Sequence, residues 1–493
     1  MTAITNASGF QTRSKEISPA IVWFRDDLRI SDNPALEYAA RQNRPVIPVY
    51  IFESEIPDHA RIGGAQKWML HHALADLANN LETLGSDLII RKGNAFQILR
   101  ELAENNGATS VYWNRRYTSH GIDIDTKIKS DFSQNQLEAK SFQASLLHEP
   151  ARLLTALGGP YKVYSPFWRA FDNSPPPRPT LPKPDKLIGV DGIESLAIND
   201  LHLLPVRPDW SSGLRQSWIP SEAAVYQEFV DFIEQRLPGY STERDIPAAG
   251  QTSRLSPFLR LGLISPYQVW YMASEADVPP NDKLKFLKEL VWREFSYHLL
   301  YHFPSLAAKN FNDKFDEFPW SGDLALFNAW KRGKTGYPLV DAGMRELWHT
   351  GYMHNRVRMV AASFLVKHLL VDWRKGERWF WDTLVDADPA SNAASWQWVA
   401  GSGADAAPYF RIFNPIIQAK KFDPDGTYVK KWVPELSGLP DRHVHEPWLA
   451  PQDIQNEAGL KMGHSYPFPI VDHKTARVRA LNAYNELKKE YVA

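Results

Sequence analysis

The sequence predicts a two-part protein: an α/β region with a parallel, Rossmann-like sheet, followed by an all-α region. Short runs rich in β-branched and aromatic residues alternate with helical segments up to about residue 150. The alternation stops at the proline-rich segment Ser174–Asp185, which is expected to be extended. Beyond that segment the periodic stretches have helical spacing. We therefore place the α/β region at 19–150, a linker at 151–215 and the helical region at 216–493.

The elements of the α/β region follow from hydrophobic pattern and capping residues. Asp32 or Asn33 can cap a helix that has Pro34 in its first turn. Strands are expected at Ala20–Phe24, Val46–Phe52, Leu88–Arg91 and Ser110–Trp113, and helices at Asp32–Gln42, Gln66–Leu84 and Ala95–Asn105. Strands that alternate with helices indicate a parallel sheet with helices on both faces.

The second half of the chain reads as helices throughout. They are expected at Ser221–Arg236, Leu284–Leu300, Leu324–Arg332, Pro338–His349, His354–Leu370 and Glu377–Leu384. No internal repeat is visible, so a solenoid is not predicted.

Composition excludes several classes of function. The chain has 493 residues, a formal charge of -1 and no cysteine, which rules out a disulfide scaffold, Cys-ligated metal and thiol catalysis. Near-neutral charge means that any nucleic-acid site must be a local basic patch. The longest apolar run is interrupted by Lys367 and His368, and nothing is long enough to span a bilayer. The first 20 residues are polar and do not form a secretory signal.

The most informative stretch is Met353–Pro415, which places arginines, acids, asparagines and tryptophans in segments that otherwise read as buried helix. Asn355, Arg358 and Met359 share one predicted helix face, and Asp388, Asn392 and Trp396 share another. Arg358 can pair with Asp386 or Asp388. Because buried polar groups must be partnered, the pattern indicates either an internal ion-pair network or a bound flat, charged ligand.

A second polar segment runs from Tyr240 to Ser256. Ser256 and Pro257 are expected to be the N-cap and first residue of a helix. A helix start with hydroxyls and an arginine can hold a phosphate, although simple capping is the commoner use of such a serine.

Leu287–Phe295 places Glu289, Trp292 and Arg293 on one helix face. The pattern fits a surface ion pair beside a half-buried indole. It equally fits a binding wall, in which the indole stacks on a ligand and the carboxylate accepts its hydrogen bonds.

Two further patterns are judged to be accidental. The segment Gly401–Ala406 matches a dinucleotide fingerprint, but no strand precedes it, as that motif requires. His298 and His302 stand four apart on a helix without a third ligand at a recognised spacing, so we expect structural histidines and no metal site.

These segments resemble the photolyase/cryptochrome family, and most closely its class III cyclobutane pyrimidine dimer photolyases. The resemblance rests on VWFRDDLRISDNPAL near the N-terminus, and on TSRLSPFL, LKELVWREF, GKTGYPLVDAGMREL, GYMHNRVRM and WQWVAGSGADAAPYFRIFNP in the family's order. It covers about residues 20 to 485. It implies light-dependent repair of cyclobutane pyrimidine dimers in DNA by a deoxyribodipyrimidine photo-lyase, with electron transfer from photoexcited reduced FAD to the flipped-out dimer.

The resemblance implies an FAD site in the helical region. The matching positions are Tyr240, Thr252, Ser253, Arg254, Leu255, Ser256, Asn355, Arg358, Asp386, Ala387, Asp388 and Asn392. Arg358 and Asp386 match an ion pair beside the isoalloxazine, and Asn392 matches the residue that faces flavin N5. Plant cryptochromes usually carry Asp at that place, so Asn392 favours repair over signalling.

The resemblance also implies the contacts with the lesion. Glu289, Asn392, Trp292, Trp398 and Met359 match the catalytic set, in which the two indoles pack on the dimer and the carboxylate bonds to its bases. DNA-binding positions are Arg244, Glu289, Trp292, Arg293, Asn355, Arg356 and Arg411. The (6-4) photolyases carry histidines where Asn355 and Met359 stand, which argues against (6-4) repair.

Photoreduction of the flavin is expected to use a tryptophan relay. Trp396, Trp373 and Trp320 match the usual triad. The outer member varies among subclasses, so routes through Trp379 or Trp381 stay open.

The expected antenna is 5,10-methenyltetrahydrofolate, with a deazaflavin or an empty pocket as alternatives. Thr118 stands where class I folate pockets have Glu, after the segment Asn114–Tyr117. The protein is expected to be a monomer in the cytoplasm, associated with the nucleoid if bacterial, with no membrane partner. The other functional hypothesis is a blue-light photoreceptor of the cryptochrome type without repair activity. The end of the chain, about 78 residues after the FNP motif, favours repair, because many cryptochromes have a long signalling tail.

Overall fold

A computed structural model describes residues 18–56, 61–406 and 410–489. Its N-terminal part is a five-stranded parallel sheet with the order β3-β2-β1-β4-β5. The strands are β1 (Ala20–Phe24), β2 (Val46–Glu53), β3 (Ile89–Gly93), β4 (Ser110–Asn114) and β5 (Glu138–Phe142). Ala20 pairs in register with Val46 on one side and with Ser110 on the other. The predicted Rossmann-like fold class is confirmed.

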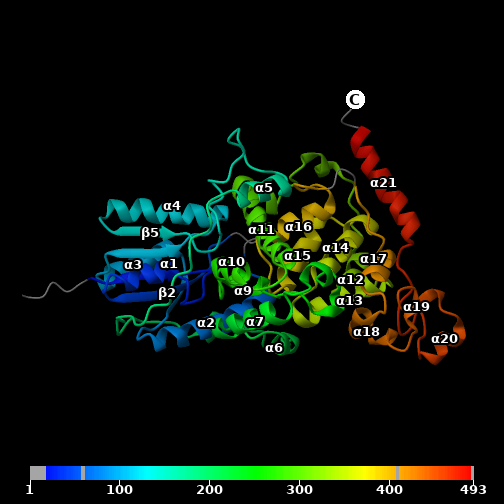
Figure 1. Cartoon of the computed structure of the whole chain (residues 1–493), viewed down its shortest axis with the longest axis horizontal. Helices are drawn as coiled ribbons and strands as arrows, with labels where there is room; N and C mark the ends of the chain where they lie inside the picture. The colour runs from blue at the N-terminus through cyan, green and yellow to red at the C-terminus, as the bar shows by residue number, and fades with distance from the viewer. Residues whose placement is uncertain (1–17, 57–60, 407–409, 490–493) are drawn as a thin grey trace, which may run out of the picture.

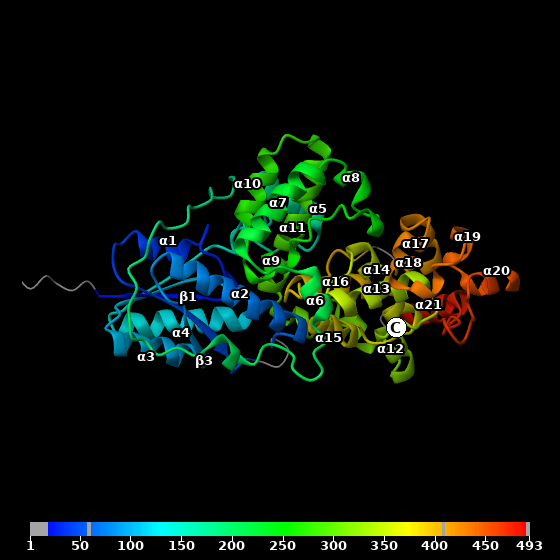
Figure 2. The same ribbon diagram turned by 90° about the horizontal axis from the view of Figure 1, so that it is seen from below.

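Helices cover both faces of this sheet, because alternate residues of each strand point to opposite sides. They are α1 (Pro34–Ala40), α2 (Gly64–Thr83), α3 (Ala95–Asn106) and α4 (Ser119–Gln134). Val22 and Phe24 pack with α1 and α2, whereas Ile21 and Trp23 pack with α3 and α4. Figure 2 shows the two pairs of helices on opposite sides of the strands. The N-cap of α1 is Asn33, whose side chain accepts a hydrogen bond from the Leu36 N–H at 3.2 Å.

The connection to the second part runs over the surface. It contains α5 (Tyr164–Asp172), the 3-10 turn η2 (Ile198–Leu201) and an irregular stretch through the prolines at 175–184. The helix α5 packs against α11 (Pro280–His302) of the helical part. Figure 1 shows this arrangement, with the sheet at one end of the molecule and the helices at the other. The proposed boundaries at 150 and 215 stay predictions.

The rest of the described chain is helical, as expected. Its α-helices are α6 (Ser212–Ser217), α7 (Glu222–Gln235), α8 (Tyr240–Glu243), α9 (Ser256–Leu261), α10 (Pro266–Glu275), α11, α12 (Leu324–Lys331), α13 (Pro338–Thr350), α14 (Asn355–Ser363), α15 (Trp373–Thr383), α16 (Ser391–Ala400), α17 (Pro415–Phe422), α18 (Thr427–Trp432), α19 (Asp441–Val444), α20 (Gln452–Glu457) and α21 (His473–Lys489). Single turns are η3 (Pro247–Ala249), η4 (Pro304–Ala307), η5 (Asp313–Glu317), η6 (Phe364–His368), η7 (Pro434–Leu436) and η8 (Pro447–Leu449). None of the described helices combines the length and apolar character needed to cross a bilayer.

One of the expected helices differs from the structure. The segment His354–Leu370 is not one helix, because α14 ends at Ser363 and the chain continues as the π-helical turn η6. Leu370 then adopts a positive φ of 54°, which ends the helix. A π turn adds a residue to the helical repeat and often marks a functional site. Here it turns Lys367 and His368 inward, where both side chains are buried.

Candidate functional site

A buried ion pair joins α14 to the segment before α16. The Arg358 guanidinium donates to Asp386 Oδ2 at 2.9 Å, and the Ser256 hydroxyl donates to the same oxygen at 2.6 Å. The second oxygen, Oδ1, is buried and has no hydrogen-bond partner among the described residues. A buried acceptor of this kind requires a donor. The carboxylate therefore fits a bound molecule that presents an N–H or O–H group.

The electrostatics of this pair favour the charged forms. Burial works against the charged guanidinium of Arg358, but the Asp386 carboxylate more than offsets it, so the pKa of Arg358 lies above its ordinary value. The Arg358 side chain also donates to the Met353 carbonyl at 2.6 Å. The structure thus selects Asp386 from the two acids that the sequence left open as partners of Arg358.

Asp388 was expected to share a helix face with Asn392 and Trp396, but the structure places it before that helix. The helix α16 begins at Ser391, so Asp388 precedes it and does not lie on the face of Asn392 and Trp396. Its carboxylate accepts hydrogen bonds from the Ser391 N–H at 2.8 Å and from the Tyr297 hydroxyl at 2.7 Å. The prediction of a shared face was wrong, because the acid satisfies the N–H groups at the helix start.

The segment between these two acids is tied to the α/β part. The carbonyl of Ala387 accepts from Arg260 Nε at 3.1 Å and also from the Gln66 amide of α2. Arg260 in turn pairs with Asp26, directly beyond β1, at 3.0 Å. The position of the 386–388 segment therefore depends on contacts from both parts of the molecule.

The 252–256 segment contacts the Asp386 carboxylate through Ser256. Arg254 has a φ of 54° and lies 4.2 Å from the Trp218 ring and 5.5 Å from the Tyr352 ring. Ser256 is the first residue of α9, not its N-cap, because its hydroxyl is bonded to Asp386. That prediction was therefore wrong by one residue. Tyr240 and Leu255 are buried beside this segment in the same hydrophobic core.

Asn392 on α16 is bonded to a residue that sequence reasoning missed. Its amide donates to Glu377 Oε1 at 2.8 Å and to the Glu377 carbonyl at 3.2 Å. Burial raises the pKa of Glu377 to about 7, although the bond from Asn392 acts in the opposite direction. Glu377 stands on α15, and no spacing pattern in the sequence links it to Asn392.

The residues expected to face the lesion lie on α11 and its neighbours. Glu289 pairs with Arg244 at 3.0 Å and with Lys285 at 3.1 Å. Trp292 stacks on Tyr164 of α5, with ring centres 3.6 Å apart and planes inclined by 7°. No local pattern predicted the contact with Tyr164, because this residue lies more than 100 positions before Trp292, in the linker. Together these contacts form a flat apolar wall with a carboxylate at its edge.

Arg293 does not join that wall. Its guanidinium is largely buried, donates to the Ser145 carbonyl at 2.6 Å and lies 3.6 Å from Glu294. These contacts favour a structural role between the two parts of the chain over contact with DNA.

A basic cluster lies beside Glu289. Arg244 and Arg356 share the carboxylate of Asp245, at 3.3 Å and 2.5 Å. Asn355 is the first residue of α14 and is exposed, and Met359 Sδ lies 3.8 Å from Arg356 Nη1. Asp245 and Glu289 together balance the two arginines, and Lys285, which also pairs with Glu289, leaves one net positive charge in this cluster.

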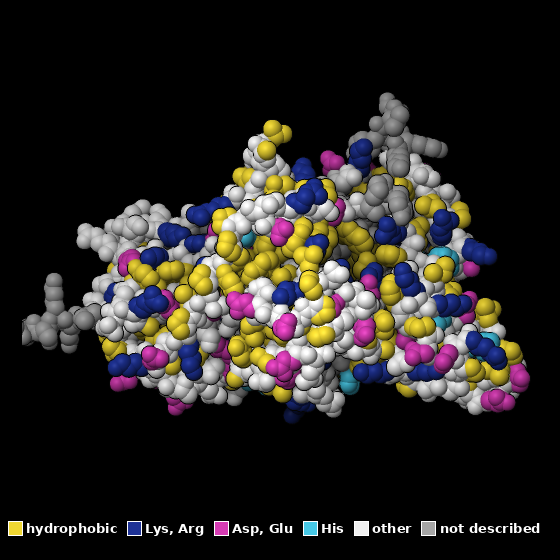
Figure 3. Space-filling model, viewed as in Figure 1, with side chains coloured by type: hydrophobic (Ala, Val, Ile, Leu, Met, Phe, Trp, Pro, Cys, Tyr) yellow, Lys and Arg dark blue, Asp and Glu magenta, His cyan; other side chains and the backbone are white. Residues whose placement is uncertain are grey.

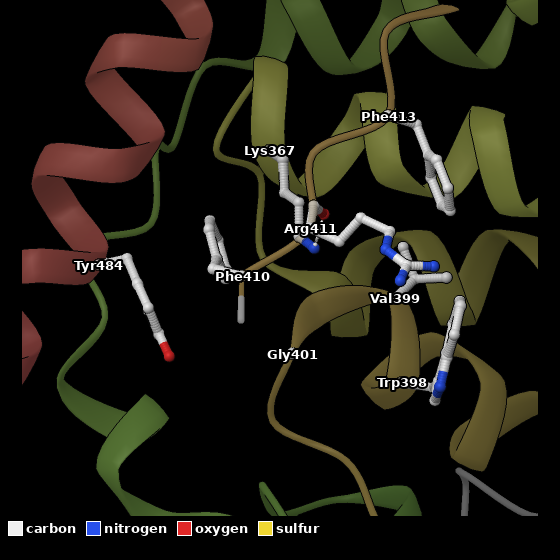
Figure 4. A pocket seen from close by; sticks show the side chains of 8 residues that line it. All are labelled: Lys367, Trp398, Val399, Gly401, Phe410, Arg411, Phe413 and Tyr484. Carbon is white, nitrogen blue, oxygen red and sulfur yellow. Dashed lines mark hydrogen bonds between the residues drawn. The ribbon is translucent and has the colours of Figure 1, made fainter. Parts of the chain in front are cut away.

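Trp398 and Arg411 line a small pocket of about 20 Å³ (Figure 4). The Trp398 indole donates to the Asp405 carbonyl at 3.0 Å. Behind Arg411 lies Lys367, which is buried, donates to the Arg411 carbonyl and places its ammonium 4.4 Å from the Phe410 ring. Burial lowers the pKa of Lys367 to about 7. Residues 407–409, which belong to the motif WQWVAGSGADAAPYFRIFNP, lie outside the described residues.

The expected relay tryptophans lie on and next to neighbouring helices. Trp396 on α16 and Trp373 on α15 are buried, whereas Trp320 is partly exposed. Gly376 lies directly against the Trp396 ring, since a Cβ at that position would overlap the indole. The Trp373 indole donates to Asn310 Oδ1 at 2.9 Å. The absence of a side chain at Gly376 therefore lets α15 approach the ring.

Trp379 and Trp381, the two alternative outer members of the relay, contact residues outside the expected triad. Trp379 stacks on the exposed Trp348, with centres 5.8 Å apart and planes inclined by 5°. The Trp381 indole donates to the Arg61 carbonyl at 2.7 Å.

The patterns judged accidental are explained by local structure. Gly401 is a left-handed C-cap of α16 with a φ of 94°, and a helix precedes it instead of a strand. His298 accepts from the Tyr161 N–H at 2.9 Å and His302 contacts the Pro150 carbonyl at 3.2 Å. No group of three or more potential metal ligands occurs in the part of the chain that the structure describes.

Comparison with known proteins identifies the family. Residues 20–185 match the family model "DNA photolyase", and residues 286–486 match "FAD binding domain of DNA photolyase". The chain is 52% identical to a deoxyribodipyrimidine photo-lyase of Agrobacterium fabrum, over 97% of this chain and 99% of that protein. It is 36% identical to cryptochrome-1 of Arabidopsis thaliana, over 95% of this chain and 70% of that protein.

Solved structures give the same result. A bacterial class III photolyase from Agrobacterium tumefaciens superposes with a TM-score of 0.94 at 52% identity, covering 98% of this chain and all of that one. A Synechocystis cryptochrome superposes with a TM-score of 0.85 at 29% identity, covering 95% of this chain. The chain thus belongs to the DNA photolyase family, and its helical part contains the family's FAD-binding domain.

Proposed function

We propose that this protein repairs cyclobutane pyrimidine dimers in DNA, using light as its energy source. The observation that carries the proposal is the buried Asp386 carboxylate, which Arg358 and Ser256 hold by one oxygen while the other accepts no hydrogen bond from any described residue. The Oδ1 atom of Asp386 can accept a hydrogen bond from a ring N–H of a flavin. The wall of Glu289 and Trp292 belongs to the same helical part and suits a flipped pyrimidine pair.

The residues around Asp386 would hold FAD and set its electronic state. Bound FAD in its reduced form would supply light-driven one-electron transfer to the dimer. Arg358 places a positive charge beside the site, which favours a ligand that carries negative charge. Asn392 adds no second negative charge there, and Glu377 fixes its amide. Trp396 and Trp373 provide buried aromatic rings through which an electron can reach the site.

The wall on α11 would bind the lesion. Trp292 offers a flat apolar surface to a dimer that has left the base stack, and its own position is fixed by Tyr164. The Glu289 carboxylate can accept hydrogen bonds from pyrimidine N–H groups, and its charge is already partly balanced by Arg244. Arg244, Arg356 and Arg411 would contact phosphates, which predicts affinity that falls as salt rises.

The deciding experiment is repair of one thymine dimer in an oligonucleotide under blue light with a reductant. Loss of the dimer in the light and its persistence in a matched dark sample would support the proposal. A protein whose flavin becomes photoreduced while dimers persist in the light would instead be a photoreceptor of the cryptochrome type, and the repair proposal would be withdrawn.

We propose 5,10-methenyltetrahydrofolate as the antenna. Two observations support this antenna. The sequence resembles class III photolyases, and the chain is 52% identical to a bacterial class III photolyase of known structure. Thr118, which departs from the class I folate pattern, has a local explanation, since its side chain accepts from the Gly121 N–H at 3.2 Å and caps α4. Mass spectrometry of the chromophores released from the native protein tests the assignment. A deazaflavin or a second FAD in that extract would replace it.

A further inference from the structure

The turn Thr155–Gly159, between β5 and α5, carries a leucine at its tip that no other side chain covers. Leu157 is 98% exposed, which is the highest value for any large hydrophobic residue in the described chain. In Figure 1 the segment before α5 rises above that helix, and in Figure 3 hydrophobic side chains cap the projection. A single exposed leucine is ordinary on a protein surface, and what distinguishes this one is its place at the tip of a projecting turn.

The tip is held in one shape. The Thr155 N–H donates to the Gly159 carbonyl at 2.9 Å, and the Gly158 N–H donates back to the Thr155 carbonyl at 2.8 Å. Gly158 has a φ of 77°, which glycine adopts without strain. The Thr155 hydroxyl also accepts from the Gly159 N–H at 3.2 Å. Leu157 is therefore presented on a tight turn and not on a loose loop.

Two histidines of α11 attach both arms of this turn to the helix. His298 accepts from the Tyr161 N–H on one arm, and His302 contacts the Pro150 carbonyl on the other. Burial lowers the pKa of His298 to about 4, so its ring is neutral near pH 7 and its Nε2 can accept. The same helix carries Glu289 and Trp292. The turn is thus fixed relative to the proposed lesion wall.

The chain beyond the turn leads directly into that wall. Tyr164 stacks on Trp292, and the residue before it, Val163, is exposed. The exposed side chains of Arg152 and Lys162 flank the turn on either arm. An apolar tip between two cations, continuous with a wall for flipped bases, matches the surface of a nucleic acid duplex: anionic outside and apolar within the stack.

We propose that Leu157 is a wedge that enters the duplex beside the dimer. This inference rests on the proposed function. A dimer that leaves the stack opens a gap and exposes the faces of neighbouring bases, which is unfavourable in water. Apolar side chains inserted between base steps occupy such gaps in DNA-bending proteins. Arg152 and Lys162 would hold the flanking phosphates while Leu157 fills the space. A single leucine offers too little area to dock a folded protein.

The test compares Leu157→Ala with Val206→Ala, a truncation at another exposed apolar position, in the holoenzyme. Binding is measured in the dark on one dimer-containing sequence, as a duplex and as a single strand. We expect L157A to weaken duplex binding about tenfold, as the loss of most of a leucine's apolar contact should, and to leave single-strand binding unchanged. V206A should match the wild type on both.

A second readout uses 2-aminopurine opposite the dimer. Wild-type protein should hold this base in an altered stack and change its emission, and L157A should reduce that change. Equal losses on duplex and single strand, or no loss on either, would overturn the wedge. If the wild type repairs dimers in neither substrate under light, the proposed function itself fails and the wedge falls with it. Repair by the wild type together with an unaltered duplex preference in L157A refutes the wedge alone.

Discussion

Replacement of Glu377 should change the pH dependence of stability in a defined way. Its carboxyl accepts from Asn392 at 2.8 Å, and burial raises its pKa from 4.5 to about 7. An acid whose pKa is raised by folding stabilises the native state below its unfolded pKa, and that contribution is lost as pH rises through the folded value. The native protein should therefore lose stability between about pH 4.5 and 7. The substitution Glu377→Gln should remove this loss, because the Gln carbonyl still accepts from Asn392.

The magnitude follows from the shift in pKa. A change of about 2.5 pKa units corresponds to an upper bound of about 3 kcal/mol, because each unit is about 1.4 kcal/mol. Unfolding entropy of about 1 kcal/mol/K for a chain of 493 residues converts this to about 3 °C in Tm. Compared with the wild type, E377Q should gain this much at pH 8 and only a small fraction of it at pH 5.

The assay is thermal unfolding of both holoproteins from pH 5 to 8, followed by release of flavin fluorescence. Glu457→Gln on α20 is the matched control, because Glu457 is exposed and should show no pH-dependent difference. A constant difference between E377Q and wild type across this range would refute the reasoning, since it would mean that Glu377 does not titrate there.

Three further substitutions test the proposed site. Asn392→Asp places a second carboxylate beside Glu377, and we expect it to destabilise reduced flavin and to lower repair, measured by anaerobic flavin spectra and dimer loss; unchanged repair would remove the argument from this residue. Glu289→Ala should slow repair at least about tenfold without emptying the FAD site, and a loss of flavin after purification would show that Glu289 acts on folding instead. Trp396→Phe should block photoreduction but spare repair by chemically reduced enzyme, with Trp210→Phe, at an exposed indole of the linker, as the control; failure of the reduced enzyme would exclude a relay role.

The fold was predictable wherever local pattern and local chemistry agree. The strand Ala20–Phe24 was expected at its observed residues, because five consecutive apolar side chains buried on both faces of a parallel sheet leave a clear signal. The start of α1 was equally predictable, since Asn33 and Pro34 act on backbone groups within three residues. The contacts of such elements are encoded within one turn or one strand.

The predictions failed where a distant residue changes a local preference. Ser256 would cap a helix by its own chemistry, but Asp386, 130 residues away, takes its hydroxyl. Asp388 has helical spacing to Asn392, yet it bonds the helix start and Tyr297 from outside. Glu377, Lys367 and Tyr164 act through partners in other segments, and no spacing pattern in the sequence links them to those partners.

These failures share a cause that bears on function. Ser256 and Asp388 lie at the proposed site, and each has a local use in its own helix that it does not adopt because it bonds another group. A residue that does not adopt its preferred local hydrogen bonds lowers the stability of the fold, and such residues are expected at functional sites. The orphaned oxygen of Asp386 is the clearest case, because the bond that would satisfy it is absent from the described residues. We therefore expect FAD binding to raise the Tm of the apoprotein strongly, and Asp386→Asn, which keeps the shape and weakens the Arg358 pair, to reduce that increase. An apoprotein already as stable as the holoprotein would show that the orphaned group carries no such cost.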